Sequence, residues 1–350
     1  MRACCRVPIR MDPRRPWRKC IPMLHALFEK IYVEERTLKD PETQRILNRA
    51  GCIKPEVISH YKDVFDKKQE VSASGRSLIL ARNPGRHLYE GAPVCQSFGN
   101  EHFYYSPGVM NCIYDCEYCF LKGMYPGKDI CIFTDIEETF SELDELEKSF
   151  PVYVCASYNT DLTALEDLTG YVDKWYRRAY EHESFSVEIR SKCSRTDIYA
   201  KLPVSDRAIF AFTLSPDEII GRFEKGAPRL EGRLRAVTAA MEAGFPVRIC
   251  FDPMIYVRNW RELYSSMIAK AAGSIDLSLV KDISIGTFRI SEQYLKNMRK
   301  KMPDSEIAQY PYISEAGYYQ YPGVVRTAME DHIRDEILNV CSEARVFNWR

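Results

Sequence analysis

The segment Cys112-Ile-Tyr-Asp-Cys116-Glu-Tyr-Cys119 decides how this sequence is interpreted. Its cysteines have the spacing C-x3-C-x2-C, and no fourth cysteine follows nearby. Three thiolates on a short loop hold three irons of a 4Fe-4S cluster and leave the last iron open for a small ligand. The other interpretation is a zinc site, which closes with four Cys or His ligands, commonly in paired C-x2-C elements. Because no second pair follows, we expect a cluster bound by Cys112, Cys116 and Cys119.

Composition limits the classes of protein that the chain can belong to. The 350 residues include 49 Lys and Arg and 49 Asp and Glu, so the formal net charge is zero and any DNA site has to be a local patch. The sequence lacks an apolar run of the roughly 18 residues that span a bilayer, so we expect no membrane partner. Thirteen cysteines form an odd set in a long chain without a signal-peptide core, which favours a reducing cytoplasm.

The cysteines outside the segment are scattered along the chain. Several of them fall in apolar, strand-like stretches, where a cysteine is most often a small buried hydrophobic residue. They are Cys4, Cys5, Cys20, Cys52, Cys95, Cys131, Cys155, Cys193, Cys250 and Cys341.

Strand-like and helix-like stretches alternate after the cysteine segment. The apolar runs are residues 152–156, 185–190, 208–214, 247–251 and 283–288, and the stretches of helical period are 136–149, 171–181, 230–243 and 260–272. With the strand expected at 103–106, they give about six β/α units, a pattern typical of a parallel sheet with helices outside. The fold class is therefore α/β, and a partial (β/α)6 barrel is the simplest assembly.

We divide the chain into four parts. Residues 1–22 are a basic leader, predicted to be disordered or to precede a true start at Met23. Residues 23–100 form a small N-terminal α/β cap, with strands at 31–35 and 77–81 and a helix at 41–49. Residues 101–302 form the partial barrel, and residues 303–350 form a C-terminal extension with an aromatic segment and a helix at 324–340.

The chemistry of a parallel barrel lies at the carboxyl ends of its strands. The residues at or after those ends are rich in Ser, Thr, Asp and Lys, and they are 112–119, 157–161, 191–192, 213–216, 252–254 and 289. A lysine in such a place, here Lys192, is suited to neutralising an anionic ligand in a partly dry site. A solvated lysine at a strand end is the other interpretation.

The cysteine segment resembles that of the radical S-adenosylmethionine (SAM) superfamily, and the order of further segments resembles the spore photoproduct lyase family. The resemblance runs from residue 31 to the last helix. It rests on Tyr118-Cys119-Phe120-Leu121, Asp135-Ile-Glu-Glu, Asn159-Thr160-Asp161-Leu162 with Asp167-Leu-Thr, Phe223-Glu-Lys-Gly226, Gly232-Arg233-Leu234, Pro253 and Trp260. The cysteine segment alone is specific only for the superfamily.

The resemblance implies a radical SAM barrel with a 4Fe-4S cluster and SAM as cofactors. It implies a carbon-carbon lyase that uses a 5′-deoxyadenosyl radical to reverse a thymine dimer. Its partners are then DNA containing thymine dimers and an electron donor such as flavodoxin or ferredoxin. By the same resemblance Tyr118 lies near the adenine of SAM, and Thr160, Lys192 and Thr213 help to hold SAM.

Two residues depart from the family pattern. Tyr158 stands where the family has its hydrogen-donor cysteine, and Phe120 stands where it has a tyrosine. We expect hydrogen transfer through Tyr118 and Tyr158 or another donor. Cys155 is a candidate donor, but an offset of three residues on a strand predicts that it faces away from Tyr158.

These departures leave two other functions open. One is a radical SAM enzyme of the same family that acts on a different substrate. The other is a non-catalytic iron-sulfur binding protein, for which Lys192 and the ordered barrel segments would have no purpose.

Overall fold

The computed structural model of this chain describes residues 27–51, 53–66, 75–92 and 95–348. The predicted leader, residues 1–22, lies outside the described residues, as do Cys4, Cys5, Cys20 and Cys52. Among the helices that the structure does describe, none has the length and apolar character needed to cross a membrane.

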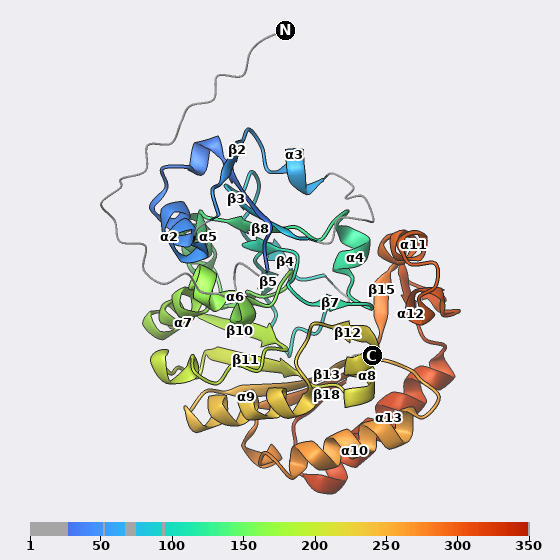
Figure 1. The fold of residues 1–350 in the computed structure, drawn as a ribbon. Helices are drawn as coiled ribbons and strands as arrows, with labels where there is room; N and C mark the ends of the chain where they lie inside the picture. The colour runs from blue at the N-terminus through green and yellow to red at the C-terminus, as the bar shows by residue number, and fades with distance from the viewer. Residues whose placement is uncertain (1–26, 52, 67–74, 93–94, 349–350) are drawn as a thin grey trace.

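Six parallel strands form the centre of the molecule and confirm the predicted partial (β/α)6 barrel (Figure 1). They are β5 (Phe103–Tyr105), β9 (Val152–Cys155), β10 (Phe185–Ser191), β11 (Ala208–Thr213), β13 (Val247–Met254) and β14 (Asp282–Thr287). β18 (Val346–Asn348) extends the sheet parallel to β14, and β4 (Tyr89–Glu90) pairs antiparallel with β5 at the other edge. Every residue of β9, β11 and β14 is buried, as expected of strands covered on both faces.

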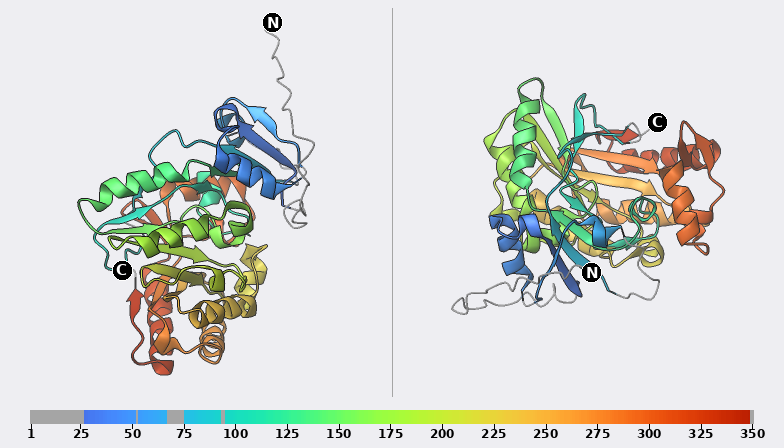
Figure 2. Two further views of the ribbon diagram at one scale, coloured as in Figure 1. Left: turned by 90° about the vertical axis from the view of Figure 1, so that its left-hand side faces the viewer. Right: turned by 90° about the horizontal axis from the view of Figure 1, so that it is seen from above.

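Helices cover the outside of the curved sheet (Figures 1 and 2). They are α5 (Ile136–Glu147), α6 (Leu162–Thr169), α7 (Tyr171–Glu181), α9 (Leu230–Glu242), α10 (Trp260–Ala272) and α13 (Gly323–Val340). α13 lies beside α10 at the end of the sheet that carries β14. The predicted helices are thus all present within two residues of their expected bounds, and α6 is a helix that was not predicted.

A second sheet forms the N-terminal cap and lies across the top of the barrel in Figure 1. Its order is β2 (Glu56–Ile58), β1 (Lys30–Glu34), β3 (Ser77–Ala81), β8 (Ile130–Phe133) and β6 (Val109–Met110). The cap also carries α2 (Pro41–Ala50) and α3 (Lys62–Phe65). Because β6 and β8 flank the cysteine segment in the sequence, this sheet is built from both sides of that segment.

Short elements complete the chain around the barrel. They are the 3-10 helices Glu35–Thr37, Tyr199–Lys201 and Leu277–Leu279, with β7 (Asp115–Cys116), α4 (Leu121–Met124), α8 (Asp217–Phe223), β12 (Glu224–Lys225), β15 (Arg289–Ser291), α11 (Glu292–Lys301), α12 (Glu306–Gln309), β16 (Ile313–Glu315) and β17 (Tyr318–Gln320). Asp40 occupies the N-cap position of α2, as predicted, but its side chain makes no capping bond; Pro41 begins the helix.

The barrel interior contains a buried arginine. Arg248 of β13 donates to Asp282 of β14 at 2.8 Å, to the Tyr153 hydroxyl of β9 at 2.5 Å, and to Glu188 of β10. Its guanidinium also lies 3.2 Å from the centre of the Phe98 ring. A buried charge is tolerated only when it is paired and hydrogen-bonded, and here the partners come from three strands of the same sheet, β9, β10 and β14. The apolar pattern of 247–251 does not reveal this arrangement.

The helix after the cysteine segment is held against α11. A Cβ atom at Gly123 would overlap the backbone of Tyr294, so only glycine allows α4 to approach α11 this closely. The side chain of Asn297 donates to the Gly123 carbonyl at 2.8 Å, and Lys301 donates to the Tyr125 carbonyl at 2.5 Å. The segment is thereby fixed at its carboxyl end.

A buried carboxylate fixes the middle of the segment. β7 of the segment pairs antiparallel with β12, which places Glu224 beside Cys116. Glu224 accepts hydrogen bonds from the Tyr118 hydroxyl, from the Ser215 hydroxyl at 2.7 Å and from the guanidinium of Arg233. Burial by itself raises the pKa of Glu224, but the attraction of Lys192 and Arg233 outweighs it, so this pKa lies below its ordinary value.

We predict that Glu224→Gln destabilises the protein by about 3–5 kcal/mol, because it leaves the buried Arg233 without its counter-charge. The matched control is Glu231→Gln. The ion pair of Glu231 with Arg235 is exposed, so this substitution should change the free energy of unfolding by no more than about 0.5 kcal/mol. Urea unfolding of the purified variants measures both values.

The stabilisation by Glu224 depends on pH in a direction that the same experiment checks. A carboxylate whose pKa is lowered in the folded state stabilises the protein fully at pH values above its ordinary pKa of 4.5. This stabilisation is lost as the pH falls through the lowered pKa of the folded state. The difference in the free energy of unfolding between wild type and Glu224→Gln therefore becomes smaller only at acidic pH. Equal unfolding midpoints for the two Gln variants at neutral pH would contradict this account.

Candidate active site

The cysteine segment forms part of the wall of a cavity of about 510 Å³. The chain leaves the barrel after β5, forms β6, and passes through the segment into α4 and β8 before it returns at β9. Cys112, Cys116 and Cys119 all line the cavity, and each is a thiol outside any disulfide. The three predicted ligands are thus gathered at one place.

A large part of the remaining cavity wall comes from the carboxyl ends of the barrel strands. Every residue predicted for the site lies in this wall, namely Cys112, Cys116, Tyr118, Cys119, Cys155, Tyr158, Thr160, Lys192 and Thr213. Ser157, Asp161, Ser191, Asp252 and Arg289, also predicted from strand ends, lie there too. The rule that parallel barrels carry their sites at this edge therefore located the cavity correctly.

Asp161 positions the residues that follow β10. Its carboxylate accepts hydrogen bonds from the Ser191 hydroxyl at 2.8 Å, from the Lys192 amide at 2.7 Å and, as the N-cap of α6, from the Ala164 amide at 3.1 Å. Burial raises the pKa of Asp161 in spite of these donors. The carboxylate joins the end of β10 to the start of α6 and so fixes the backbone at Lys192.

Lys192 faces the cysteines rather than solvent. Its ammonium lies 5.5 Å from the centre of the Tyr118 ring. Burial lowers the pKa of Lys192, but Cys116 and Glu224 raise it more, so the ammonium keeps its charge. The alternative interpretation of Lys192 as a solvated strand-end residue is wrong.

Two polar atoms in this region are buried without a hydrogen-bond partner among the described residues, Oγ1 of Thr160 and Oδ1 of Asn159. Buried polar groups are normally satisfied, and an exception points to a group that binds there. Since Thr160 lines the cavity, its hydroxyl is available to a polar ligand beside Lys192. This observation fits SAM, which carries amino and carboxylate groups.

The thiols of the segment also fit an iron-sulfur cluster. Burial raises the pKa of Cys112 and Cys119 and raises that of Cys116 to about 12. The positive charge of Lys192 lowers the pKa of Cys116 and Cys119 and so offsets part of the effect of burial. Thiolates in such surroundings form when a bound cation supplies positive charge. The donor set is three thiols without a fourth ligand from the segment, as predicted.

Tyr158 and Cys155 line the same cavity, so the prediction that they face opposite ways is wrong. Strand alternation stops at Cys155, where β9 ends, and residues 156–159 form a turn. The Tyr158 ring stacks on Tyr105 with centroids 4.3 Å apart and lies 5.4 Å from Phe120.

Cys95 is one of the cavity residues that the sequence analysis did not predict. Sγ of Cys95 lies 3.3 Å from the hydroxyl oxygen of Tyr158, and Cys95 belongs to the cavity wall. No motif marks Cys95, because it reaches the site from the chain before the barrel. Glu224 was missed as well, although it stands in the segment 223–226 that carries the family resemblance.

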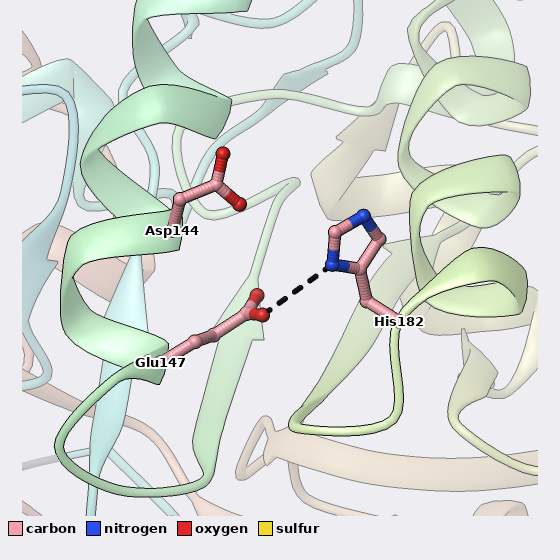
Figure 3. A group of neighbouring side chains, drawn as sticks. All are labelled: Asp144, Glu147 and His182. Carbon is pink, nitrogen blue, oxygen red and sulfur yellow. Dashed lines mark ion pairs between the residues drawn. The ribbon is translucent and has the colours of Figure 1, made fainter.

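A separate cluster of metal-ligand residue types lies outside the cavity. Asp144 and Glu147 of α5 face His182, and Nδ1 of His182 is 3.6 Å from Oε2 of Glu147 (Figure 3). Arg178 pairs with Asp144, and the Ser184 hydroxyl donates to Glu147 at 2.7 Å. Because a guanidinium already neutralises the carboxylates, we interpret the cluster as an ion-pair network that joins α5 to α7.

Solved structures with the same fold include two of spore photoproduct lyase. The enzyme complexed with dinucleoside spore photoproduct has a TM-score of 0.79 and 17% identity, covering 92% of this chain and 99% of that chain. A double mutant with bound AdoMet and dinucleoside spore photoproduct has a TM-score of 0.79 and 17% identity, covering 91% and 98%.

Sequence comparison gives the same result. Spore photoproduct lyase from Bacillus subtilis (strain 168) is 23% identical over 265 residues, which cover 72% of this chain and 74% of the relative. A family model described as Spore photoproduct lyase matches residues 100–336, more than half of the chain. The chain therefore belongs to the spore photoproduct lyase family.

Proposed function

We propose that this protein is a radical SAM enzyme that repairs the spore photoproduct, a thymine dimer of DNA, and that it does so as a carbon-carbon lyase. The observation that carries the proposal is the gathering of three thiols, the unpartnered Thr160 hydroxyl and the Lys192 ammonium in one cavity. Membership of the spore photoproduct lyase family supports it. The related structures bind AdoMet and dinucleoside spore photoproduct, the ligands that the proposal requires.

In this proposal Cys112, Cys116 and Cys119 hold a 4Fe-4S cluster at the cysteine segment. When bound, the cluster and SAM supply the radical that starts the repair. Lys192 pairs with the carboxylate of SAM, and the Thr160 hydroxyl satisfies a polar group of the same ligand. Thr213, from the end of β11, completes this side of the cavity.

The loop and its neighbours orient these groups. Asp161 fixes the backbone of Lys192 through a hydrogen bond of 2.7 Å. The Tyr118 hydroxyl donates to Glu224, so the ring of Tyr118, rather than its O–H group, would be the part left to contact the adenine of SAM. The closed packing of α4 against α11 keeps the segment rigid, which is what precise placement of reacting groups requires.

An aromatic part of the cavity wall suits a pair of joined bases. Its wall includes the aromatic rings of Tyr105, Tyr158, Tyr294 and Tyr318, on which bases can stack. A dimer must leave the DNA stack to enter, and damaged bases leave it at lower cost. The whole cavity, which would also hold the cluster and SAM, has a volume of about 510 Å³, in the range of small-molecule sites.

A different substrate is the second candidate, because Tyr158 and Phe120 depart from the family pattern. A non-catalytic iron-sulfur protein is disfavoured, since it has no use for Lys192 and an unpartnered Thr160 hydroxyl inside the cavity. In either enzymatic case a low-potential one-electron donor, such as flavodoxin or ferredoxin, is required as a partner.

We predict that replacing Cys112, Cys116 and Cys119 together by Ala removes the cluster. Anaerobic reconstitution of the wild type should give about four iron atoms per chain with broad visible absorbance, and the variant should give neither. Cys341→Ser is the control, because Cys341 lies outside the cavity wall. Full iron content in the triple variant would rule out the segment as the cluster site.

We predict that Lys192→Met weakens SAM binding by roughly 10- to 100-fold, since a hydrogen bond to a charged group contributes about 1.5–3 kcal/mol. Calorimetric titration of SAM into the reconstituted protein measures the change. Lys201→Met is the control, because that side chain is 72% exposed. Unchanged affinity in Lys192→Met would remove Lys192 from the SAM site.

The repair activity is tested by anaerobic incubation of the reconstituted protein with SAM, dithionite and a synthetic spore photoproduct dinucleotide. Chromatography follows thymine products and 5′-deoxyadenosine. We expect conversion of the dimer to two thymines. Formation of 5′-deoxyadenosine without repair would instead favour the second candidate, an enzyme with another substrate.

A further inference from the structure

Cys95 and Tyr158 form a thiol-phenol pair in the wall of the cavity. Sγ of Cys95 and the hydroxyl oxygen of Tyr158 lie 3.3 Å apart, within hydrogen-bond distance for sulfur. Stacking on Tyr105 at 4.3 Å and contact with Phe120 at 5.4 Å fix the ring of Tyr158. The phenol is thus held in the cavity wall, in contact with the thiol.

Several of the other hydrogen-bearing groups nearby are committed elsewhere. The thiols of the cysteine segment are the cluster ligands of the proposed function, and the Tyr118 hydroxyl donates to Glu224. Phe120 has no O–H group. Among the described residues of the cavity wall, the thiols outside the segment are Cys95 and Cys155, and of these two Cys95 is the one in hydrogen-bond contact with a phenol.

We propose that Cys95 is the hydrogen-atom donor of this enzyme and that Tyr158 relays the hydrogen from its sulfur to the substrate. The inference rests on the proposed repair function, in which a carbon-centred radical of the opened dimer must gain a hydrogen atom. Thiols and phenols are the protein groups that release a hydrogen atom most readily.

The relay balances in two steps. The O–H bond of Tyr158 breaks and a C–H bond forms on the substrate, which leaves the radical on the phenol oxygen. The S–H bond of Cys95 then breaks and restores the phenol, so the net change is one hydrogen atom moved from sulfur to carbon. The sulfur radical returns to the thiol by taking one electron from the low-potential donor and one proton from water.

The surroundings keep both groups protonated. Burial raises the pKa of the Cys95 thiol more than its bond to Tyr158 lowers it, and burial also raises the pKa of the Tyr158 phenol. A thiolate or a phenolate has no hydrogen atom to give, so a dry pair is suited to this transfer.

Solvent deuterium distinguishes donation from a structural role. Thiol and phenol hydrogens exchange with D₂O, so repair by the wild-type holoenzyme in D₂O should place deuterium in the product thymine. We expect Cys95→Ala, Cys95→Ser and Tyr158→Phe each to lower the yield of deuterated thymine about tenfold or more. Binding of the dinucleotide should stay within about twofold of wild type. Cys341→Ser, the matched control, should behave as wild type.

The serine variant decides between the two roles. A serine hydroxyl keeps a polar contact with Tyr158 but holds its hydrogen too strongly to donate it. Wild-type yields of deuterated thymine in Cys95→Ser would therefore overturn the proposal and leave Cys95 with a structural role. Wild-type yields in Cys95→Ala, with the variant folded by circular dichroism, would overturn it as well.

A second measurement needs neither cofactor nor turnover. On the cluster-free protein, N-ethylmaleimide labelling followed by mass spectrometry gives the alkylation rate of each cysteine. We expect dinucleoside spore photoproduct to slow labelling of Cys95 about tenfold and to leave Cys341 unchanged. Equal rates with and without the ligand would overturn the relay, because Tyr158 and Cys95 would then lie away from the lesion.

The two proposals fail in different ways. If the wild type repairs the dimer while the Cys95 variants do so equally well, the relay alone is overturned. If the wild type leaves the dimer intact, the proposed function is overturned and the relay with it.

Discussion

The buried carboxylate of Glu224 is the constraint on which the arrangement of the cavity depends. It is the point where the cysteine segment, the connection between β11 and α8, and α9 meet, through Tyr118, Ser215 and Arg233. It also attracts the half-buried Lys192, so one negative charge faces two cations next to the three thiols of the segment. The orientation of Tyr118 follows from this group, and together with Cys116 the same group favours the charged form of Lys192.

Periodicity predicted most of the fold because the barrel strands are buried on both faces. Continuous apolar runs such as β11 leave a clear signal, and the helices between them are amphipathic. β8 is as apolar as these strands but was not assigned, because it lies in the connection after the cysteine segment and pairs with the cap. The hairpin of β16 and β17 was missed because its strands are three residues long and mostly exposed or half-buried.

The position of the site was predictable, but its internal contacts were not. Strand ends identified Thr160, Lys192 and Thr213, since topology alone brings those ends together. Cys95 enters the cavity from a segment without periodicity, so only tertiary contact reveals it. The orientation predicted for Cys155 was wrong because the alternation rule holds only while the strand continues, and β9 stops there.

The distance in sequence between Tyr118 and Glu224 has a consequence for how the protein matures. Their side chains are hydrogen-bonded although they are 106 residues apart. On the ribosome the cysteine segment emerges first, and β12, α9 and Arg233 follow only later. Until then the three thiols lack the walls that bury them and are open to oxidation. We therefore expect a cluster to be inserted after the barrel has been synthesised. Cluster insertion would then be a late step of assembly and would not nucleate folding.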